Sequence, residues 1–337
     1  METHLLTTPQ DLALFSAWQR SLPDGSLWQS PEWKKYQEAL GREVRIYALL
    51  EGTQIFASVL VVIDKTAFGL STWDIPRGPI WDLGLRTKNR GNFLETIIAD
   101  AKMSRCLSLY LSPLTLLQAA SYPSDRVIRA GNLQASSRHE QPSATRIINL
   151  EISETDILKQ MKPKGRYNIS VAEKHGIHVQ QSEDIGVFFD LIKKTGHRDN
   201  FSIHSRRHYE MFLQELPGSF LCIAHTEQGE PIAGLLGVIW GSKAYYYYGA
   251  SDHDHRALMA PYALQWAAMQ HCKACGCTSY DLFGIAPLDA PLDHPWQGVS
   301  GFKEKFGGTV VTYPPEQEIV LRPVAKRLLQ LKRRLLG

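Results

Sequence analysis

Basic side chains gather in the stretch MKPKGRYNISVAEKHG, residues 161–176, although the formal net charge of the chain is only +3. Ammonium and guanidinium groups bind anions best beside a helix start, where backbone amides also point outward. Lys162, Lys164 and Arg166 flank Pro163, at a predicted corner between two helices. The stretch therefore predicts a phosphate-binding corner. The alternative is a solvated helix face, as for most charge runs.

The two helices of this corner have sequence signals of their own. Ser153 and Asp156 have the spacing of a capping box and predict a helix that runs to about Met161. A second helix is expected from about 166 to 174, after the break at the proline.

A second basic cluster lies in KKTGHRDNFSIHSRRHY, residues 193–209. Its basic residues face the single acid Asp199 and are Lys193, Lys194, Arg198, Arg206 and Arg207. Two such clusters beside predicted helix ends favour a polyanionic partner over a solvated surface.

Thiols and an imidazole crowd into HCKACGC, residues 271–277, with a spacing similar to that of zinc ligands. Cys272 and Cys275 fall in the last turn of a predicted helix, and Cys277 begins a buried strand. The sequence offers no second ligand pair nearby. We therefore expect no metal, and buried free thiols instead.

The elements that position these residues occur twice in the chain. The first half reads as a hairpin turning at Gly52, a helix over 91–104 and a strand. The second half has a hairpin turning at Gly229, a strand, a helix with Pro261 in its first turn and Gly276 beyond its end, and a last strand. Matching landmarks lie about half the chain apart, which indicates a duplicated domain.

Each repeat resembles the fold of the GCN5-related N-acetyltransferases. We predict an α/β (α+β) protein of two tandem domains of this kind, each a mixed, mainly antiparallel sheet flanked by helices. The length of 337 residues suits two domains. The polar stretch SSRHEQPSATR, residues 136–146, predicts the join between them.

Neither repeat has the usual coenzyme A cradle, which is a Gly-rich loop at a helix start. In the second repeat this place reads DHDHRALMAP, without glycine and with Pro261 removing an amide. In the first repeat it reads LGLRTKNRG, which is basic but has no G-x-G spacing. The fold thus predicts acyl transfer from a donor other than acyl-CoA.

The last stretch, RPVAKRLLQLKRRLLG, is predicted to be a basic helix with an apolar stripe of Val324, Leu328, Leu331 and Leu335. One interpretation packs the stripe on a domain and leaves the charges solvated. The other is attraction to an anionic membrane surface or to RNA.

The first residues do not resemble a signal peptide, and the longest apolar runs are far below the ~20 residues that span a bilayer. The five cysteines are odd in number and suit a reducing compartment. We expect a cytoplasmic protein, which the basic helix would bring to the inner face of the membrane.

Five stretches resemble, in order and spacing, the motifs of the FemABX family of tRNA-dependent aminoacyltransferases: PRGPIWD, MKPKGRYNISVAEKHGIHV, YYYYGAS, YDLFGI and GFKEKFGG. The resemblance runs from about Gln29 to the end of the sequence. It implies transfer of an amino acid from aminoacyl-tRNA to an amine of a peptidoglycan precursor stem peptide, in cell-wall synthesis and without a cofactor. Both partners, the tRNA and a nucleotide-linked or lipid-linked precursor, are polyanions that suit the basic clusters.

The chain resembles the compact, FemX-like form of the family, because no sustained heptads indicate a coiled-coil insertion. In that form the last segment returns to the first domain. We expect a domain of residues 1–146 with 318–337 on the acceptor side, a domain of residues 147–317 on the aminoacyl-tRNA side, and a monomer.

Two residues of GFKEKFGG match the family's Phe-Lys pair at the donor end. The resemblance implies that Phe302 stacks on the terminal adenine, and that Lys303 stabilises the oxyanion or holds the terminal phosphate. Lys305 would lie on the same side of a predicted strand and help to bind tRNA. The alternative for Lys303 is a surface lysine at a strand edge.

The implied acceptor site includes Tyr248, which matches a family tyrosine and would share a strand face with Tyr246. Arg206 lies one residue from a phosphate-binding arginine of the family, whose position holds Ser205 in the simplest alignment. Tyr209 matches the tyrosine neighbour of that arginine.

Two further positions depart from the family pattern. Lys35 is the nearest substitute for a phosphate-binding lysine whose position holds Gln37. Ser112 replaces an acid that often precedes the following proline. Both departures concern the acceptor and leave its identity open.

Asp281 is the acid of YDLFGI, on a strand expected to be central in the second sheet. It is either a structural acid bonded to loop amides or a group that orients an amine or acts as a base. Two other functions stay open: an acyl-CoA-dependent N-acyltransferase, and a non-catalytic protein that binds RNA or a lipid precursor. The missing cradle argues against the first, and the Phe302–Lys303 pair against the second.

Overall fold

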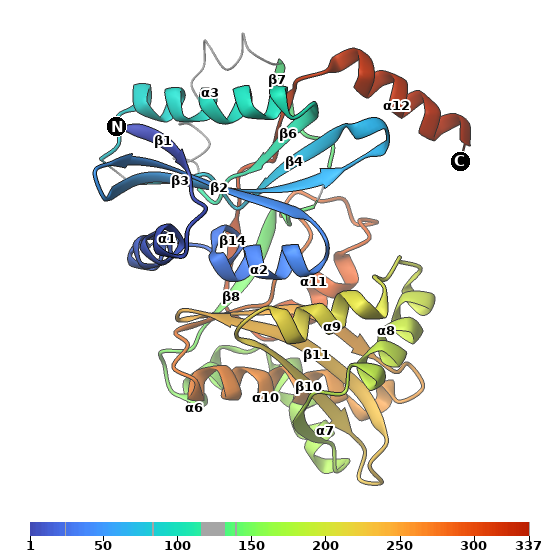
Figure 1. The fold of residues 1–337 in the computed structure, drawn as a ribbon. Helices are drawn as coiled ribbons and strands as arrows, with labels where there is room; N and C mark the ends of the chain where they lie inside the picture. The colour runs from blue at the N-terminus through green and yellow to red at the C-terminus, as the bar shows by residue number, and fades with distance from the viewer. Residues whose placement is uncertain (24, 83, 116–131, 139, 337) are drawn as a thin grey trace. The chain divides into compact units, whose positions relative to one another are not determined.

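The computed structural model describes residues 1–23, 25–82, 84–115, 132–138 and 140–336. It contains two compact units, Met1–Gln141 with Tyr313–Gly337 and Pro142–Thr312 (Figure 1). The chain passes between them a few residues before the domain borders expected from the sequence. Within the part described, no helix is both long and apolar enough to cross a membrane.

The first unit is built on an eight-stranded sheet of order β1-β2-β3-β4-β6-β15-β7, with β5 paired to β3. Its strands are β1 (Glu2–Leu5), β2 (Glu43–Glu51), β3 (Gln54–Lys65), β4 (Ser71–Pro76), β5 (Ile80–Trp81), β6 (Cys106–Ser112), β7 (Asn132–Ala135) and β15 (Gln317–Val320). Its described helices are α1 (Pro9–Ser21), α2 (Pro31–Ala39), α3 (Thr87–Met103) and α12 (Pro323–Leu336). The pair β4–β6 is parallel and the other described pairs are antiparallel.

The hairpin, helix and strand predicted for the first half are confirmed. Gly52 joins β2 to β3 with a φ of 59°, which glycine adopts without strain. Phe93 and Ile97 of α3 are fully buried with Trp73 and Leu109 of the sheet. This unit therefore has its own core beneath α3.

The helix α12 leaves three members of its predicted apolar stripe in solvent, and the side chain of the fourth, Leu335, lies outside the described part of the chain. Val324, Leu328 and Leu331 are 71%, 62% and 53% exposed. The interpretation that packs these three side chains on a domain is therefore wrong. The helix instead contacts the sheet through Lys326, whose ammonium pairs with the buried carboxylate of Glu318.

The second unit is built on a seven-stranded sheet of order β14-β8-β13-β12-β11-β10-β9. Its strands are β8 (Ala144–Asn149), β9 (His178–Ser182), β10 (Ser219–His225), β11 (Pro231–Trp240), β12 (Lys243–Ser251), β13 (Ser279–Asp281) and β14 (Thr309–Thr312). Its described helices are α6 (Glu154–Gln160), α7 (Pro163–Lys174), α8 (Ile185–Asp199), α9 (Arg206–Glu215), α10 (Ala260–Ala274) and α11 (Gln297–Glu304). Figure 1 shows α9 and α10 against opposite faces of this sheet.

The predicted hairpin, helix and strands of the second half are confirmed, with Gly229 at a φ of 85° and Gly276 at 83°. Ser153 caps α6 by accepting a hydrogen bond from the amide of Asp156 at 3.1 Å, as expected. The start predicted for the next helix is wrong, because α7 begins at Pro163. A proline in the first turn loses no helical hydrogen bond, so it starts this helix.

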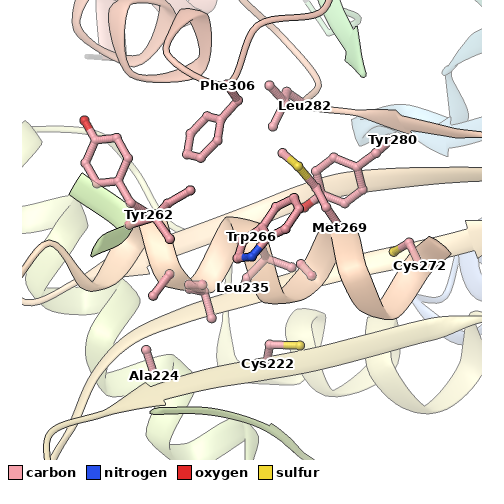
Figure 2. Close-up of a cluster of buried hydrophobic side chains, with 14 of the residues drawn as sticks. Cys222, Ala224, Leu235, Tyr262, Trp266, Met269, Cys272, Tyr280, Leu282 and Phe306 are labelled. Atoms are coloured by element: carbon pink, nitrogen blue, oxygen red, sulfur yellow. The ribbon is translucent and has the colours of Figure 1, made fainter. Parts of the chain in front are cut away.

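The core of the second unit lies where α10 packs on the sheet (Figure 2). Its members include Tyr262, Trp266 and Met269 of α10, with Tyr280, Leu282 and Phe306 from the segments around them. Figure 2 shows the ring of Phe306 beside the end of α10 that carries Tyr262, and the two ring centroids are 5.6 Å apart.

The strand predicted over GFKEKFGG is wrong, because Gln297–Glu304 forms α11 and β14 begins only at Thr309. The alternation of aromatic and charged residues suggested a strand. Phe302 and Phe306, however, are also four apart, and both rings pack on Tyr262. Two glycines in left-handed conformations, Gly307 and Gly308, then separate the helix from β14.

Candidate active site

Lys303 is buried, with 6% of its surface exposed, in the last turn of α11. Its ammonium donates hydrogen bonds to the carbonyl oxygens of Gly284 at 2.7 Å and Phe283 at 3.2 Å. The ring of Tyr246 lies 5.5 Å from the same nitrogen. The alternative of a surface lysine at a strand edge is therefore wrong, because the helix turns this side chain inward.

The two carbonyls belong to a turn that Asp281 organises at the end of β13. Asp281 accepts hydrogen bonds from the amide of Phe283 at 2.7 Å and from the hydroxyl of Thr145. Phe283 is left-handed, with a φ of 59°, and its ring stacks on Tyr247 at 4.9 Å. The predicted bonding of Asp281 to a loop amide is confirmed, and the resulting turn presents its carbonyls to Lys303.

Burial lowers the pKa of Lys303 to about 8, and the negative charge of Asp281 opposes part of this shift. The side chain therefore exchanges its proton only slightly above neutral pH. A fixed cation with such a pKa can stabilise an oxyanion or donate a proton to a leaving group. Acyl transfer requires both actions.

The end of α11 lies against the start of α7. The Lys162 amide donates to the Lys305 carbonyl at 3.0 Å, and the Lys162 ammonium pairs with Glu304 at 2.5 Å. Gly165 permits this approach, because a Cβ there would lie 2.3 Å from the Lys305 carbonyl oxygen. Since α11 is a helix, the prediction that Lys305 shares a strand side with Lys303 is wrong, and its ammonium donates instead to the Gly301 carbonyl at 3.0 Å.

Lys162, Lys164 and Arg166 lie together at the start of α7, but they differ in their contacts. The guanidinium of Arg166 donates to carbonyls at the end of α6, that of Met161 among them. Lys164 is exposed, and its ammonium lies 4.7 Å from the ring of Tyr167, which is 60% exposed. The corner therefore presents a cation and an aromatic ring to solvent, and Tyr167 did not stand out in the sequence.

Phe302 is half-buried and packs edge-to-face on Tyr262 and on Phe306, each at 5.1 Å. These contacts attach α11 to α10. Part of the Phe302 ring is exposed, and Phe302 directly precedes Lys303 in the sequence. Stacking of this part on a base stays a prediction.

Tyr209 and Tyr248 are brought together, with ring centroids 5.1 Å apart in an edge-to-face arrangement. Tyr209 is buried and supports the half-buried Tyr248. The hydroxyl of Tyr248 lies 2.8 Å from Nε2 of His208, whose ring stacks on His204 at 3.9 Å. Neither histidine was predicted as a site residue, although their spacing beside a helix start was a usable signal.

A β-bulge separates Tyr246 from Tyr248. The pairing of β12 with β11 shifts between the partners of these two tyrosines, and the extra residue breaks the alternation of faces. Tyr246 interacts with Gln265 of α10 and with Lys303, whereas Tyr248 contacts α9. The prediction that both tyrosines share a strand face is therefore wrong. Burial raises the pKa of Tyr246 to about 12.

Acids pair with most of the second basic cluster. The pairs are Lys193–Asp190 at 2.8 Å, Lys194–Asp252 at 2.6 Å, Arg198–Asp199 at 2.6 Å and Arg206–Glu210 at 2.8 Å. Three of these acids lie outside the sequence window that suggested the cluster, so the window overstated its positive charge. Arg206, the first residue of α9, still has an exposed side chain.

In the first unit, Lys35 lies exposed on α2. Gln37, which replaces the lysine of the family, is buried and accepts a hydrogen bond from Arg42 at 2.7 Å. A charged group at position 37 would be costly without an ionic partner. The role of the exposed Lys35 as an anion ligand stays a prediction.

Ser112, which replaces an acid of the family, contacts an acid from another segment of the first unit. Its hydroxyl donates to the carboxylate of Glu316 at 2.9 Å. Arg138 bridges Glu316 and Asp74 at 3.2 and 2.8 Å, and burial raises the pKa of Asp74 to about 6. No local sequence pattern indicated this cluster, because its four members come from four separate segments.

The thiols near His271 are free, with Cys272 and Cys277 buried and Cys275 exposed. Nδ1 of His271 lies 2.9 Å from the side-chain nitrogen Nε2 of Gln181. Among the described residues, no three metal-ligating side chains gather in one place.

Comparisons with known proteins show which family and which fold this chain resembles. The model of the FemAB family matches residues 12–230 and 221–333. The chain is 23% identical to a lipid II:glycine glycyltransferase of Staphylococcus saprophyticus, over 86% of this chain and 87% of that protein. The crystal structure of FemX superposes with a TM-score of 0.81 at 19% identity, over 97% of this chain and 99% of that one.

A tandem GNAT protein from the clavulanic acid biosynthesis pathway also superposes, with a TM-score of 0.54 at 10% identity, over 95% of this chain and 98% of that one. The predicted fold of two tandem acetyltransferase-like domains is confirmed by these likenesses. The family match covers both units, and the chain belongs to the FemAB family.

Proposed function

We propose that this protein transfers an amino acid from aminoacyl-tRNA to an amine of a peptidoglycan precursor stem peptide, and that it acts as a monomer. Membership of the FemAB family supports the reaction. The relative named lipid II:glycine glycyltransferase favours the lipid-linked precursor as acceptor. The observation that carries the proposal is the buried ammonium of Lys303.

In this reaction the neutral amine attacks the ester carbonyl carbon, a C–N bond forms and an electron pair moves to the carbonyl oxygen. The tetrahedral intermediate then expels the tRNA ribose oxygen, which gains a proton while the new amide nitrogen loses one. Lys303 stabilises the oxyanion, an effect worth about 3–4 kcal/mol for one well-placed donor. Its two carbonyl partners fix the charge before the substrate arrives.

The donor is assigned to the side where α7 meets α11. Lys164 and Tyr167 face solvent there, and Lys162, Arg166 and Lys305 add positive charge to the same corner. A cation beside an exposed ring suits a nucleic acid backbone with stacked bases. Phe302 would receive the terminal adenine.

In the second unit, the acceptor is assigned to Tyr248 on its Tyr209 support, with Arg206 as a phosphate ligand. In the first unit, Lys35 is a separate candidate for binding a phosphate of the acceptor. The hydroxyl of Tyr248 already shares a hydrogen bond with His208, so it is oriented. Arg206 is exposed and suits a pyrophosphate that remains partly hydrated.

An acyl-CoA donor is disfavoured by Asp252. This buried carboxylate lies at the start of the loop that precedes α10, where the fold would otherwise bind a pyrophosphate. Its partner is the ammonium of Lys194 at 2.6 Å. The carboxylate thus engages the ammonium of Lys194, which would otherwise be a cation for a phosphate at this loop.

The test is incubation with a mixture of charged tRNAs and with lipid-linked or nucleotide-linked precursor, the products being identified by mass. We expect one aminoacyl residue on the lipid-linked precursor. Transfer from acyl-CoA with none from charged tRNA would overturn the proposal.

Lys303→Met should lower the single-turnover rate about 10²–10³-fold. It also removes the donor of two carbonyls, at a cost of about 1–3 kcal/mol of folding stability, so the fold of the variant is confirmed by circular dichroism. The matched control is Lys305→Met, which should raise the KM for tRNA and leave the rate at saturation. Equal rate losses in both variants would assign the chemistry elsewhere.

A further inference from the structure

The exposed stripe of α12 is an apolar feature of the described residues that the proposed reaction does not use. Val324, Leu328 and Leu331 are four and three residues apart, so they lie on one face of the helix. More than half of each residue is exposed. Isolated exposed leucines are ordinary, but an aligned set on one helix marks an interaction surface.

The opposite side of α12 holds the helix in place. The ammonium of Lys326 pairs with Glu318 of β15, and the guanidinium of Arg322 donates to the carbonyl of Lys102 at 3.1 Å. Ala325 and Leu329 are half-buried. Polar anchors on one side thus keep the stripe directed to solvent.

The charge of this segment is of one sign. The sequence from Ile319 onward contains no acid, while Arg327 is exposed on the helix next to Leu328. Lys332, Arg333 and Arg334 follow in the sequence. The surface therefore combines aliphatic side chains with a strong positive charge.

We propose that α12 binds the surface of an anionic lipid bilayer. The aliphatic stripe would enter the boundary between headgroups and acyl chains, and the basic side chains would stay at the level of the lipid phosphates. RNA satisfies the charges but offers no apolar layer for the three aliphatic side chains. The inference does not depend on the transfer reaction, although a lipid-linked acceptor would be reached from the same surface.

The test is flotation of the full chain with vesicles of phosphatidylcholine alone or mixed with phosphatidylglycerol. We expect binding to the mixed vesicles that weakens with salt. The double variant Leu328→Gln with Leu331→Gln should reduce the partition coefficient tenfold or more. This reduction corresponds to about the transfer free energy of one buried leucine side chain. Arg327→Gln should reduce it about fivefold at low salt.

Matched controls come from exposed residues elsewhere. Leu288 and Leu292 are 74% and 96% exposed, so Leu288→Gln with Leu292→Gln should leave flotation unchanged. Lys88, exposed on α3, gives the charge control Lys88→Gln. Thermal melts of each variant verify that the fold is intact.

Four outcomes would overturn the proposal. The first is that the wild type does not float with anionic vesicles. The second is that the paired leucine variant floats like its control. The third is a vesicle-free dimer that the leucine variant dissociates, which would assign the stripe to a second copy. Loss of tRNA binding in the leucine variant with flotation retained would assign it to RNA.

Discussion

At the scale of single residues, the burial of Lys303 affects both the proposed reaction and the free energy of unfolding. Its pKa in the folded protein is about 8, below the ordinary value of 10.5, because the charged form is desolvated. Between these two pH values the unfolded chain binds more protons than the folded chain, so the free energy of unfolding rises with pH. We expect a rise of roughly 3 kcal/mol from this group across pH 8 to 10.5.

The measurement is urea unfolding of the wild type and of Lys303→Met across this pH range. Tyrosines and cysteines titrate in both proteins, so their contribution cancels in the difference. The wild type should gain stability relative to the variant as the pH increases. A pH-independent difference would mean that Lys303 is already neutral at pH 7 or is well hydrated.

The identity of this residue was predictable and its environment was not. The Phe302–Lys303 pair is adjacent in the sequence, so the family resemblance was enough to select it. Its carbonyl partners lie in a turn about twenty residues earlier, shaped by the left-handed Phe283. No local pattern announces a left-handed phenylalanine, because the conformation depends on the bond to Asp281.

At the scale of elements, the contact between α7 and α11 should depend on one glycine. Gly165→Ala places a methyl group 2.3 Å from the Lys305 carbonyl oxygen, which is backbone and cannot move aside. We expect a loss of about 1–3 kcal/mol in urea unfolding. Gly298→Ala is the control, since its added Cβ meets nothing within 4 Å, and it should stabilise α11 by about 0.5–1 kcal/mol. Similar effects of the two changes would contradict this close contact.

The bulge in β12 gives a second test at this scale. Tyr248→Phe removes the hydroxyl that meets His208 and should raise the KM for the acceptor about tenfold, as for one lost hydrogen bond to a charged group. Tyr246→Phe removes the same atom from the tyrosine that interacts with α10. That change should leave the acceptor KM unaltered and cost about 1 kcal/mol of stability. An equal rise in the acceptor KM in both variants would contradict the assignment of the two tyrosines to opposite faces of the sheet.

Most elements were predictable because their signals are local. Glycines at hairpin turns and prolines in first turns mark the ends of strands and helices in both repeats. The prediction of a strand in place of α11 was wrong, because Phe302, Lys303 and Phe306 fit both the strand and the helix periodicity. Packing of the two phenylalanines on Tyr262 decides between them. The bulge in β12 was not predicted for a related reason, because the register of a strand is set by its partner strand.

At the scale of the whole molecule, the placement of charge matters more than its sum. Lys164→Gln and Lys174→Gln each remove one positive charge from an exposed lysine of α7, at opposite ends of the helix. If tRNA binds at the start of α7, Lys164→Gln should reduce the salt slope of binding by about one and Lys174→Gln should not. Filter binding over a salt series measures both. Equal salt slopes in the two variants would mean that tRNA binding depends on the net charge of the protein and not on the start of α7.

The sheet of the first unit has a consequence for the order in which the protein is completed during synthesis. In the part of the chain described, β7 pairs with β15 alone, and β15 follows the whole second unit in the sequence. At 5–20 residues per second, β7 leaves the ribosome roughly ten to forty seconds before its partner exists. The second unit is continuous and can close its own sheet within that interval. The half of the protein that is made first is thus the half that is finished last, with an open strand edge exposed to its surroundings in the meantime.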